Sequence, residues 1–271
     1  MRRSRQRFSS GLCATGLLAL ALALLGSTAS AQTVSVCVDP EPPPWTYWVR
    51  NSQGQRTDRI AGFTVDLLQR VFDRIGRPVQ ILGNLPWARC LKMVAAGEVD
   101  FVADAYLDDE RARVYAYSMA YNTLTPQVWS RLDAPVSPRT RDDLRALRGC
   151  GMHGASYAHY GIDAAELDTG VSSYIKLIEK LRRGRCDYVL EELEVLAGFW
   201  QHHQDMLGKR ADLTSMRPAW ASGPTKHLLT RRGGPAASLI GEIDRELRLA
   251  IRDGTAGKLW RQHAGELAYQ P

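Results

Sequence analysis

The feature that most constrains the fold is a helix followed directly by a short apolar strand. Pro86 suits the first turn of a helix, apolar residues then recur at helical spacing, and Gly97 tolerates the left-handed conformation that often ends a helix. Residues 99–103 alternate too little to form a half-exposed strand. A short apolar run after a helix predicts an inner strand of a parallel sheet, with both faces covered.

The same unit recurs in the second half of the chain. Residues 97–104 read GEVDFVAD and residues 184–191 read GRCDYVLE, so each has a helix-ending glycine, an Asp, an apolar strand (99–103 and 186–190) and an acid at the same offset. Strands at 33–38 and 79–82 flank a helical pattern that ends at Gly76. This alternation predicts parallel α/β units, and the repeat predicts two lobes that bring strand ends to a shared cleft. The alternative is a coincidence between two ordinary βα units.

The N-terminus has the pattern of a secretory signal peptide. Four arginines precede an apolar run at residues 12–25, and Ala-Ser-Ala at 29–31 predicts cleavage after Ala31. The alternative is a retained membrane anchor. Residues 1–31 contain four of the 35 Lys and Arg residues and no Asp or Glu. The mature chain therefore has 31 Lys and Arg against 29 Asp and Glu and is nearly neutral. No basic excess then argues for a nucleic acid or an anionic membrane as partner.

Four segments, in a fixed order, give the chain a resemblance to a known family. They read IAGFTVDLL at 60–68, GEVDFVAD at 97–104, DDERARVYAYS at 108–118 and RGRCDYVLEE at 183–192. Together they resemble the extracellular solute-binding proteins of family 3, the amino-acid-binding type that supplies ABC importers. The PWARC pattern at 86–90 is associated with one branch of that family.

The resemblance implies an α/β fold of the periplasmic-binding-protein type II. Two lobes, each with a mixed sheet flanked by helices, would be joined by a hinge of two strands. Lobe 1 would comprise residues 32–123 with 224–271, and lobe 2 would comprise residues 124–223, after a signal peptide at 1–31.

Four cysteines lie beyond the signal peptide, an even number in a chain bound for an oxidising compartment. With two lobes, Cys37 and Cys90 fall in one lobe, and Cys150 and Cys186 fall in the other. We predict these two disulfides, although four cysteines allow three pairings and the alternative is four buried thiols. No Cys or His cluster has metal-ligand spacing, so we expect neither a metal nor a cofactor.

The resemblance assigns binding roles to three sites in the sequence. Arg111 takes the position of the family's carboxylate-binding arginine, and Glu192 takes that of its ammonium-binding acid. The turn of Gly154, Ala155 and Ser156 stands where a Gly-Ser/Thr turn completes the carboxylate site. A free amino acid needs such a forked donor and such an acidic acceptor. The alternative for Arg111 is a solvated residue in a charged run.

Further candidates lie beside the expected cleft. Trp45 and Trp87 would form walls against a ligand side chain, with the lobe core as the alternative for each. Arg89 follows Trp87 closely enough to point at the same cleft. Tyr106 lies at the carboxyl end of the predicted inner strand, where open α/β sheets bind ligands.

Three acids depart from the family pattern and bear on the charge of the ligand. Asp104 stands where a small hydroxyl residue or Gly is usual, Glu191 doubles the acid at Glu192, and Asp39 follows the first strand. Set against the two candidate arginines, these acids favour a cationic ligand such as a basic amino acid or an amine. The alternative is internal ion pairing that leaves the pocket near neutral.

The sequence therefore predicts a monomeric periplasmic solute-binding protein. It would capture an amino acid or a related amine in the interlobe cleft and deliver it to an ABC transporter permease in the inner membrane. One alternative is an enzyme on the same fold, similar to cyclohexadienyl and arogenate dehydratases, with Glu191 or Glu192 as proton donor. Another is an extracellular sensor module.

Overall fold

The computed structural model describes residues 32–202 and 210–271, which belong to one compact unit of the chain. The signal peptide predicted at residues 1–31 lies outside the described residues. No helix in the described ranges is long and apolar enough to cross a membrane.

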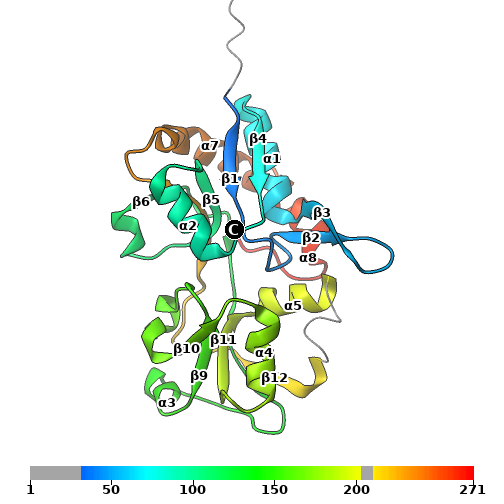
Figure 1. The fold of residues 1–271 in the computed structure, drawn as a ribbon, viewed down its shortest axis with the longest axis vertical. Coiled ribbons are helices and arrows are strands. Elements are labelled where there is room, and N and C mark those ends of the chain that lie inside the picture. The colour runs from blue at the N-terminus through cyan, green and yellow to red at the C-terminus, as the bar shows by residue number, and fades with distance from the viewer. Residues whose placement is uncertain (1–31, 203–209) are drawn as a thin grey trace, which may run out of the picture. The chain divides into compact units, whose positions relative to one another are not determined.

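The first sheet is mixed, and its strands in chain order are β1 (Val34–Cys37), β4 (Val79–Leu82), β5 (Phe101–Tyr106), β6 (Tyr115–Tyr117), β7 (Asn122–Thr123) and β13 (Thr225–Arg231). The spatial order is β4-β1-β5-β13-β6, and β7 also pairs with β13 (Figure 1). β1 is parallel to β4 and β5, whereas β13 is antiparallel to β5, β6 and β7. The predicted inner strand is therefore present, in a sheet that is mixed rather than wholly parallel.

Helices α1 (Phe63–Ile75) and α2 (Trp87–Ala96) pack on opposite faces of this sheet. Phe101 of β5 belongs to the apolar cluster that contains α1, and the next residue, Val102, belongs to the cluster that contains α2. Successive side chains of a strand point to opposite faces. β5 is therefore covered on both faces, which explains its nearly continuous apolar sequence.

The glycines that the sequence marks as helix ends do end these helices. α1 stops at Gly76 and α2 stops at Gly97, with φ of 74° and 76°, in the left-handed region where glycine carries no steric penalty. Near the C-terminus, a 3₁₀ turn, η5 (Pro235–Leu239), leads directly into helix α7 (Ile240–Arg252), and helix α8 (Thr255–Ala264) follows.

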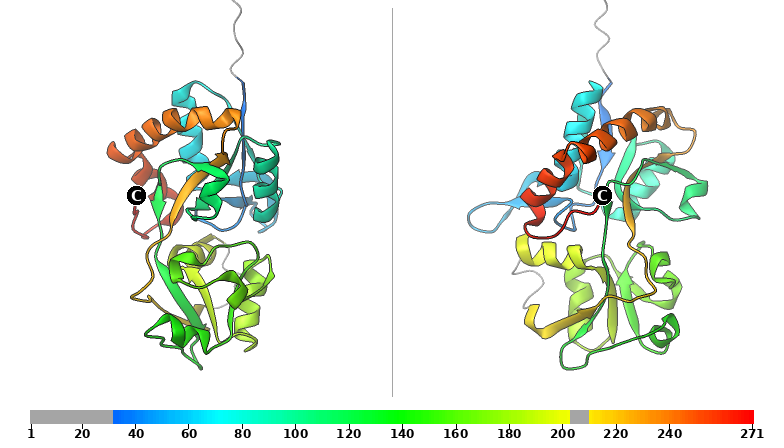
Figure 2. Two further views of the ribbon diagram at one scale, coloured as in Figure 1. Left: turned by 90° about the vertical axis from the view of Figure 1, so that its left-hand side faces the viewer. Right: turned by 180° about the vertical axis from the view of Figure 1, so that it is seen from behind.

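The second sheet contains β8 (Pro126–Arg131), β9 (Gly149–Met152), β10 (Asp168–Val171), β11 (Tyr188–Glu192) and β12 (Leu213–Met216). The order is β10-β9-β11-β8-β12, with β9 and β10 parallel and β8 antiparallel to β11 (Figure 2). The strand predicted at 186–190 thus extends to Glu192, and both glutamates belong to it. Its helices are α3 (Arg141–Arg145), α4 (Tyr174–Arg182) and α5 (Leu193–His202).

The remaining elements are short. β2 (Tyr47–Arg50) and β3 (Arg56–Ala61) form a hairpin whose turn contains Gly54. Single 3₁₀ turns are η1 (Arg111–Arg113), η2 (Ala158–Tyr160), η3 (Ala164–Glu166) and η4 (Arg210–Asp212).

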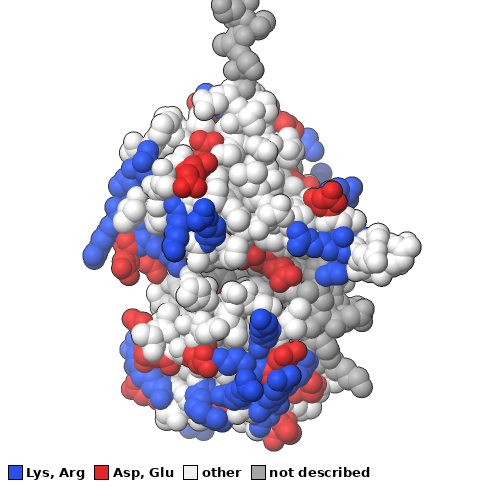
Figure 3. All heavy atoms as spheres, in the orientation of Figure 1, with Lys and Arg blue, Asp and Glu red and all other residues white. Residues whose placement is uncertain are grey.

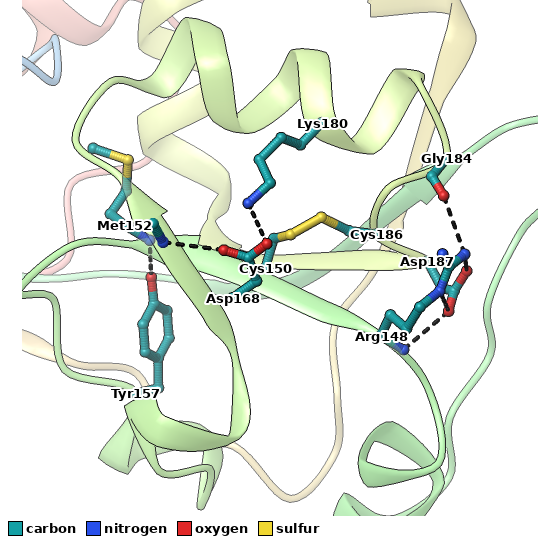
Figure 4. Close-up of a disulfide and its surroundings, with 10 residues drawn as sticks. Arg148, Cys150, Met152, Tyr157, Asp168, Lys180, Gly184, Cys186 and Asp187 are labelled. Atoms are coloured by element: carbon teal, nitrogen blue, oxygen red, sulfur yellow. Dashed lines mark hydrogen bonds and ion pairs between the residues drawn. A yellow bond between two sulfur atoms is a disulfide. The ribbon is translucent and has the colours of Figure 1, made fainter.

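Both predicted disulfides are confirmed. Cys37 of β1 is bonded to Cys90 of α2, with Cα atoms 5.6 Å apart. Cys150 of β9 is bonded to Cys186, which lies just before β11, with Cα atoms 5.8 Å apart (Figure 4). Each bond therefore ties a strand to the helix–strand unit whose strand pairs with it, β1 to α2–β5 and β9 to α4–β11.

Candidate functional site

The pocket beside the carboxyl ends of β1, β5 and β11 encloses about 970 Å³, counting the space open to solvent. Figure 3 shows a recess near the middle of the face that it draws, with atoms of Asp or Glu side chains beside it. Nine of the eleven residues predicted to bind ligand line the pocket: Asp39, Trp87, Asp104, Tyr106, Arg111, Ala155, Ser156, Glu191 and Glu192. Their contact with a ligand stays a prediction.

The two other predicted residues, Trp45 and Arg89, do not line the pocket. Trp45 has no exposed surface, packs 5.7 Å from Trp260 between ring centroids, and donates from Nε1 to Asn122 Oδ1 over 2.7 Å. It is a core residue, the alternative that the sequence left open. Arg89 lies in the first turn of α2 with an exposed side chain. The helix turns by about 100° per residue, so Arg89 faces away from the surface that Trp87 presents.

Glu192 is a buried carboxylate of β11 held by donors from β5 and from the η2 turn. The hydroxyl of Tyr106 on β5 donates to Oε2 over 2.6 Å, and Nε2 of His159 donates to Oε1 over 2.7 Å. Burial raises the pKa of Glu192, but the hydrogen bonds and charge of His159, with bonds from Glu191 and Tyr106, outweigh it and lower the pKa to about 2. Glu192 is therefore ionised at neutral pH.

Glu191 is the member of this pair of acids that holds its proton more tightly. Burial raises its pKa well above the ordinary value, and the charge of Glu192 raises it further. Two adjacent carboxyl groups in one site resist double ionisation. The pKa values of the two adjacent acids are therefore driven apart, that of Glu191 upward and that of Glu192 downward.

Asp104 occupies a bulge of β5. It has φ of 64°, and the pairing of β5 with β13 shifts register between His227 and Leu229. Asp is one of the few residues other than glycine that adopts this left-handed conformation readily. A bulge redirects a side chain, and here Asp104 Oδ1 accepts hydrogen bonds from the hydroxyls of Thr64 and Tyr121, at 2.8 and 2.9 Å.

Arg111 and its neighbours contact the second sheet. Arg111 Nη2 donates to the carbonyl of Gly154 over 2.9 Å, and the hydroxyl of Ser156 donates to Asp108 Oδ2 over 2.7 Å. Burial raises the pKa of Asp108, but Ser156 and the N–H and charge of Arg111 outweigh it, and the pKa is lowered. The predicted carboxylate-binding arginine and the predicted Gly-Ser turn are thus in direct contact.

Asp39 accepts two backbone hydrogen bonds at the end of β1. The N–H of Glu41 and the N–H of Trp87 donate to its two oxygens, each over 3.2 Å. Burial raises its pKa to about 7, against the lowering effect of these N–H groups. Asp39 therefore changes charge near neutral pH.

Lys226 is a pocket residue that the sequence analysis missed. Its side chain is buried, its Nζ is 4.0 Å from Asp104 Oδ1, and Nζ lies 4.0 Å from the centroid of the Trp45 ring. Asp104 therefore faces Lys226, while Arg111 is bonded to Gly154. The cation set against the pocket acids is Lys226 rather than Arg89.

Other lining residues also carried no sequence signal, and these are Glu41, Thr46, Tyr157, His159 and Tyr174. The proline-rich segment after β1 supplies two of them, and turns and a helix of the second sheet supply the rest. Across residues 32–202 and 210–271, no group of three His, Cys, Asp or Glu side chains has the geometry to hold a metal ion.

Comparisons with known proteins agree with this architecture. The sequence model of the bacterial extracellular solute-binding proteins, family 3, matches residues 34–266. No curated protein matches the sequence at a significant level.

Solved structures share the fold at low sequence identity. The substrate binding protein of an amino acid ABC transporter has a TM-score of 0.69 at 18% identity, covering 85% of this chain and 98% of its own. The arginine-, lysine-, histidine-binding protein ArtJ from Geobacillus stearothermophilus has a TM-score of 0.71 at 18% identity, covering 87% and 96%. A histidine kinase sensor domain with similarity to periplasmic binding proteins has a TM-score of 0.71 at 18% identity, covering 88% and 99%.

These likenesses establish the type II periplasmic-binding-protein fold. The family match covers nearly all of the described residues, from β1 to the end of α8. The chain therefore belongs to the bacterial extracellular solute-binding proteins, family 3.

Proposed function

We propose that this protein is a periplasmic solute-binding protein that captures an amino acid or a related amine and delivers it to an ABC importer. The observation that carries the proposal is that Arg111 and Glu192 line the same pocket. Arg111 comes from the η1 turn after β5 of the first sheet, and Glu192 comes from β11 of the second sheet. A guanidinium fork suits the carboxylate of an amino acid, and an ionised acid suits its ammonium group. The similar amino-acid-binding proteins support this ligand class.

The proposal includes a division into two lobes that close on the ligand. Lobe 1 comprises residues 32–123 with 224–271, and lobe 2 comprises residues 124–223. The separate sheets support these limits, because β7 and β13 pair within the first sheet while β8 begins the second at Pro126. Chain crossings near 124 and 224 form the hinge.

Closure is supported by the contacts that already join the two sheets. Tyr106 binds Glu192, Ser156 binds Asp108, and Arg111 binds the carbonyl of Gly154. A bound solute adds contacts to both lobes and thereby stabilises the closed arrangement. The protein acts as a monomer, and its closed form is the one that docks on the permease.

Binding is tested by thermal unfolding of the mature protein, residues 32–271, with a panel of amino acids, polyamines, dicarboxylates and prephenate. A ligand at 100 times its Kd stabilises the folded state by about 2.7 kcal/mol. Arg111→Ala abolishes this stabilisation for ligands with a carboxylate. Arg113→Ala is the matched control, because Arg113 lies in the same turn with an exposed side chain outside the pocket lining. Absence of any shift across the panel would contradict the proposal.

A second candidate function is an enzyme that eliminates water from a prephenate-like acid. The observation that favours it is Glu191, a carboxyl group whose pKa is raised by burial and by the charge of Glu192, at the pocket surface. Such a group can donate a proton to a leaving hydroxyl. Incubation with prephenate or arogenate tests this function, and absence of an ultraviolet-absorbing product that depends on Glu191 excludes it. Glu191→Gln serves as the control for that dependence.

A further inference from the structure

The ammonium group of Lys226 is placed deep in the pocket. Lys226 lies on β13 opposite Tyr106 of β5, and its side chain is 4% exposed. Nζ stands 4.0 Å from the centroid of the Trp45 ring and 5.5 Å from that of Tyr106. Trp45 is fixed in turn by its hydrogen bond to Asn122. The aromatic rings therefore hold the ammonium in one position by cation–π attraction and contact.

The acids around Lys226 already have their hydrogen-bond donors within the protein. Asp104 is bonded by two hydroxyls, Glu192 by Tyr106 and His159, and Asp39 by two backbone N–H groups. Burial and the charge of Glu192 raise the pKa of Glu191, so its carboxyl group holds a proton more tightly than an ordinary one. Asp104 and Asp39 therefore place little demand on a ligand for further donors, whereas the ionised Glu192 keeps free lone pairs for the ammonium group of the ligand.

Lys226 differs from these acids in its hydrogen bonding. Its nearest carboxylate oxygen, Asp104 Oδ1, is 4.0 Å from Nζ, which is an ion-pair distance and too long for a hydrogen bond. Within the described part of the chain, Nζ has no hydrogen-bond acceptor. A buried ammonium with three free N–H donors is costly unless an acceptor reaches it. Because Lys226 lines the pocket, that acceptor can come from a ligand.

We propose that Lys226 is a specificity-determining residue whose ammonium binds an oxygen acceptor on the ligand other than the carboxylate assigned to Arg111. This inference rests on the proposed function and narrows its ligand class. The ligand is an amino acid, or a related solute, that carries a second oxygen group such as a carboxylate or an amide. A ligand without that group leaves the ammonium desolvated and unpaired, so the pocket selects against it.

The test compares probes that differ only in this second oxygen group. L-Glutamate and L-glutamine carry it, whereas L-norvaline has a methyl group in its place. Binding of each is measured by calorimetry to the wild-type protein and to Lys226→Met, a variant that keeps the length of the side chain and removes the donors. The matched control is Lys176→Met, because Lys176 lies on α4 with an exposed side chain outside the pocket lining.

We expect the wild type to prefer the better of the two oxygen-bearing probes over L-norvaline by about 10- to 100-fold, the effect of one hydrogen bond to a charged group. Lys226→Met removes that preference, while Lys176→Met retains it. A purely structural role for Lys226 would weaken all three probes equally, and that result would overturn the inference. Equal wild-type affinity for L-norvaline and the oxygen-bearing probes would do the same.

Lys226→Arg protects the test against a folding defect in Lys226→Met. It keeps the charge beside Asp104 and the donors in the pocket, so it should retain at least part of the preference. Loss of the whole preference in folded Lys226→Arg, with L-norvaline binding unchanged, would contradict the inference, because the charge and the donors are still present. A wild-type protein that binds best to putrescine or L-arginine, unaffected by Lys226→Met, would overturn this inference and leave the binding function intact. Binding of nothing in either panel would contradict both.

Discussion

The hydroxyl of Tyr106 donates a 2.6 Å hydrogen bond to Oε2 of Glu192, and the two residues belong to different sheets. The same carboxylate is bonded by His159 and is ionised at neutral pH. One buried charge therefore links the two halves of the pocket, and its protonation state bears on stability as well as on binding.

Replacing Tyr106 by Phe removes this link while keeping the ring. We expect the free energy of unfolding at pH 7 to fall by about 1.5–3 kcal/mol, the range for a hydrogen bond to a charged group. The pKa of Glu192 should rise, because one of the bonds that lowers it is lost. A folded-state pKa below the ordinary value of 4.5 stabilises the protein above that pH, and this stabilisation is lost as the pH falls towards about 2. In Tyr106→Phe the loss should therefore begin at the same pH, which the unfolded chain sets, but be smaller in total and complete at a higher pH. Urea titrations between pH 2 and 7 would measure this difference.

Tyr117→Phe is the matched comparison for that variant. The hydroxyl of Tyr117 on β6 is buried and has no hydrogen-bond partner within the residues that the structure describes. Removing an unsatisfied buried hydroxyl relieves a desolvation penalty of about 1–3 kcal/mol. We expect Tyr117→Phe to be as stable as the wild type or more stable in the same urea titrations. A loss as large as that in Tyr106→Phe would show that the Tyr117 hydroxyl has a partner after all.

Asp39 should make stability depend on pH in the opposite direction from Glu192. Its folded-state pKa is raised from 3.8 to about 7, so the folded protein binds a proton more tightly than the unfolded chain. The resulting stabilisation is complete below the unfolded pKa and is lost as the pH rises through about 7. Asp39→Asn removes the proton exchange. We therefore expect the free energy of unfolding of Asp39→Asn, minus that of the wild type, to increase with pH between these two pKa values. The increase is up to about 1.4 kcal/mol per pH unit. The contribution of Glu191 to the pH dependence is present in both proteins and cancels in this difference. A difference in the free energy of unfolding that stays constant across this pH range would argue against the raised pKa of Asp39.

The two disulfides should stabilise the protein to a similar extent. They join residues 53 and 36 positions apart, and the entropy of loop closure depends only on the logarithm of that separation. Replacing either pair by serine is expected to lower the free energy of unfolding by about 2–4 kcal/mol. Chemical denaturation with and without reductant measures both effects. If reductant left the unfolding of the wild type unchanged, neither disulfide would be contributing.

Local sequence patterns were sufficient for most helices and strands. α1 and α2 end at the glycines that the sequence marks, and β4 occupies the predicted residues, because helix caps and apolar periodicity act over a few neighbouring residues. β11 was placed too early by two residues at its start, since the apolar run gave no reason to include the two glutamates. The motif at residues 183–192 nevertheless placed Glu192 correctly at the pocket.

The charge balance of the pocket could be decided only by the tertiary structure. The sequence identified Asp39, Asp104 and Glu191 as acids near strand ends, but it could not show that hydroxyls, backbone N–H groups and a neighbouring carboxyl group partner them. Lys226 and His159 face pocket acids that are distant in the sequence: His159 is 33 residues from Glu192, and Lys226 is 122 residues from Asp104. Periodicity reports which face of an element is buried, whereas the partner of a buried charge depends on how distant elements pack, and that information is absent from any single stretch of sequence.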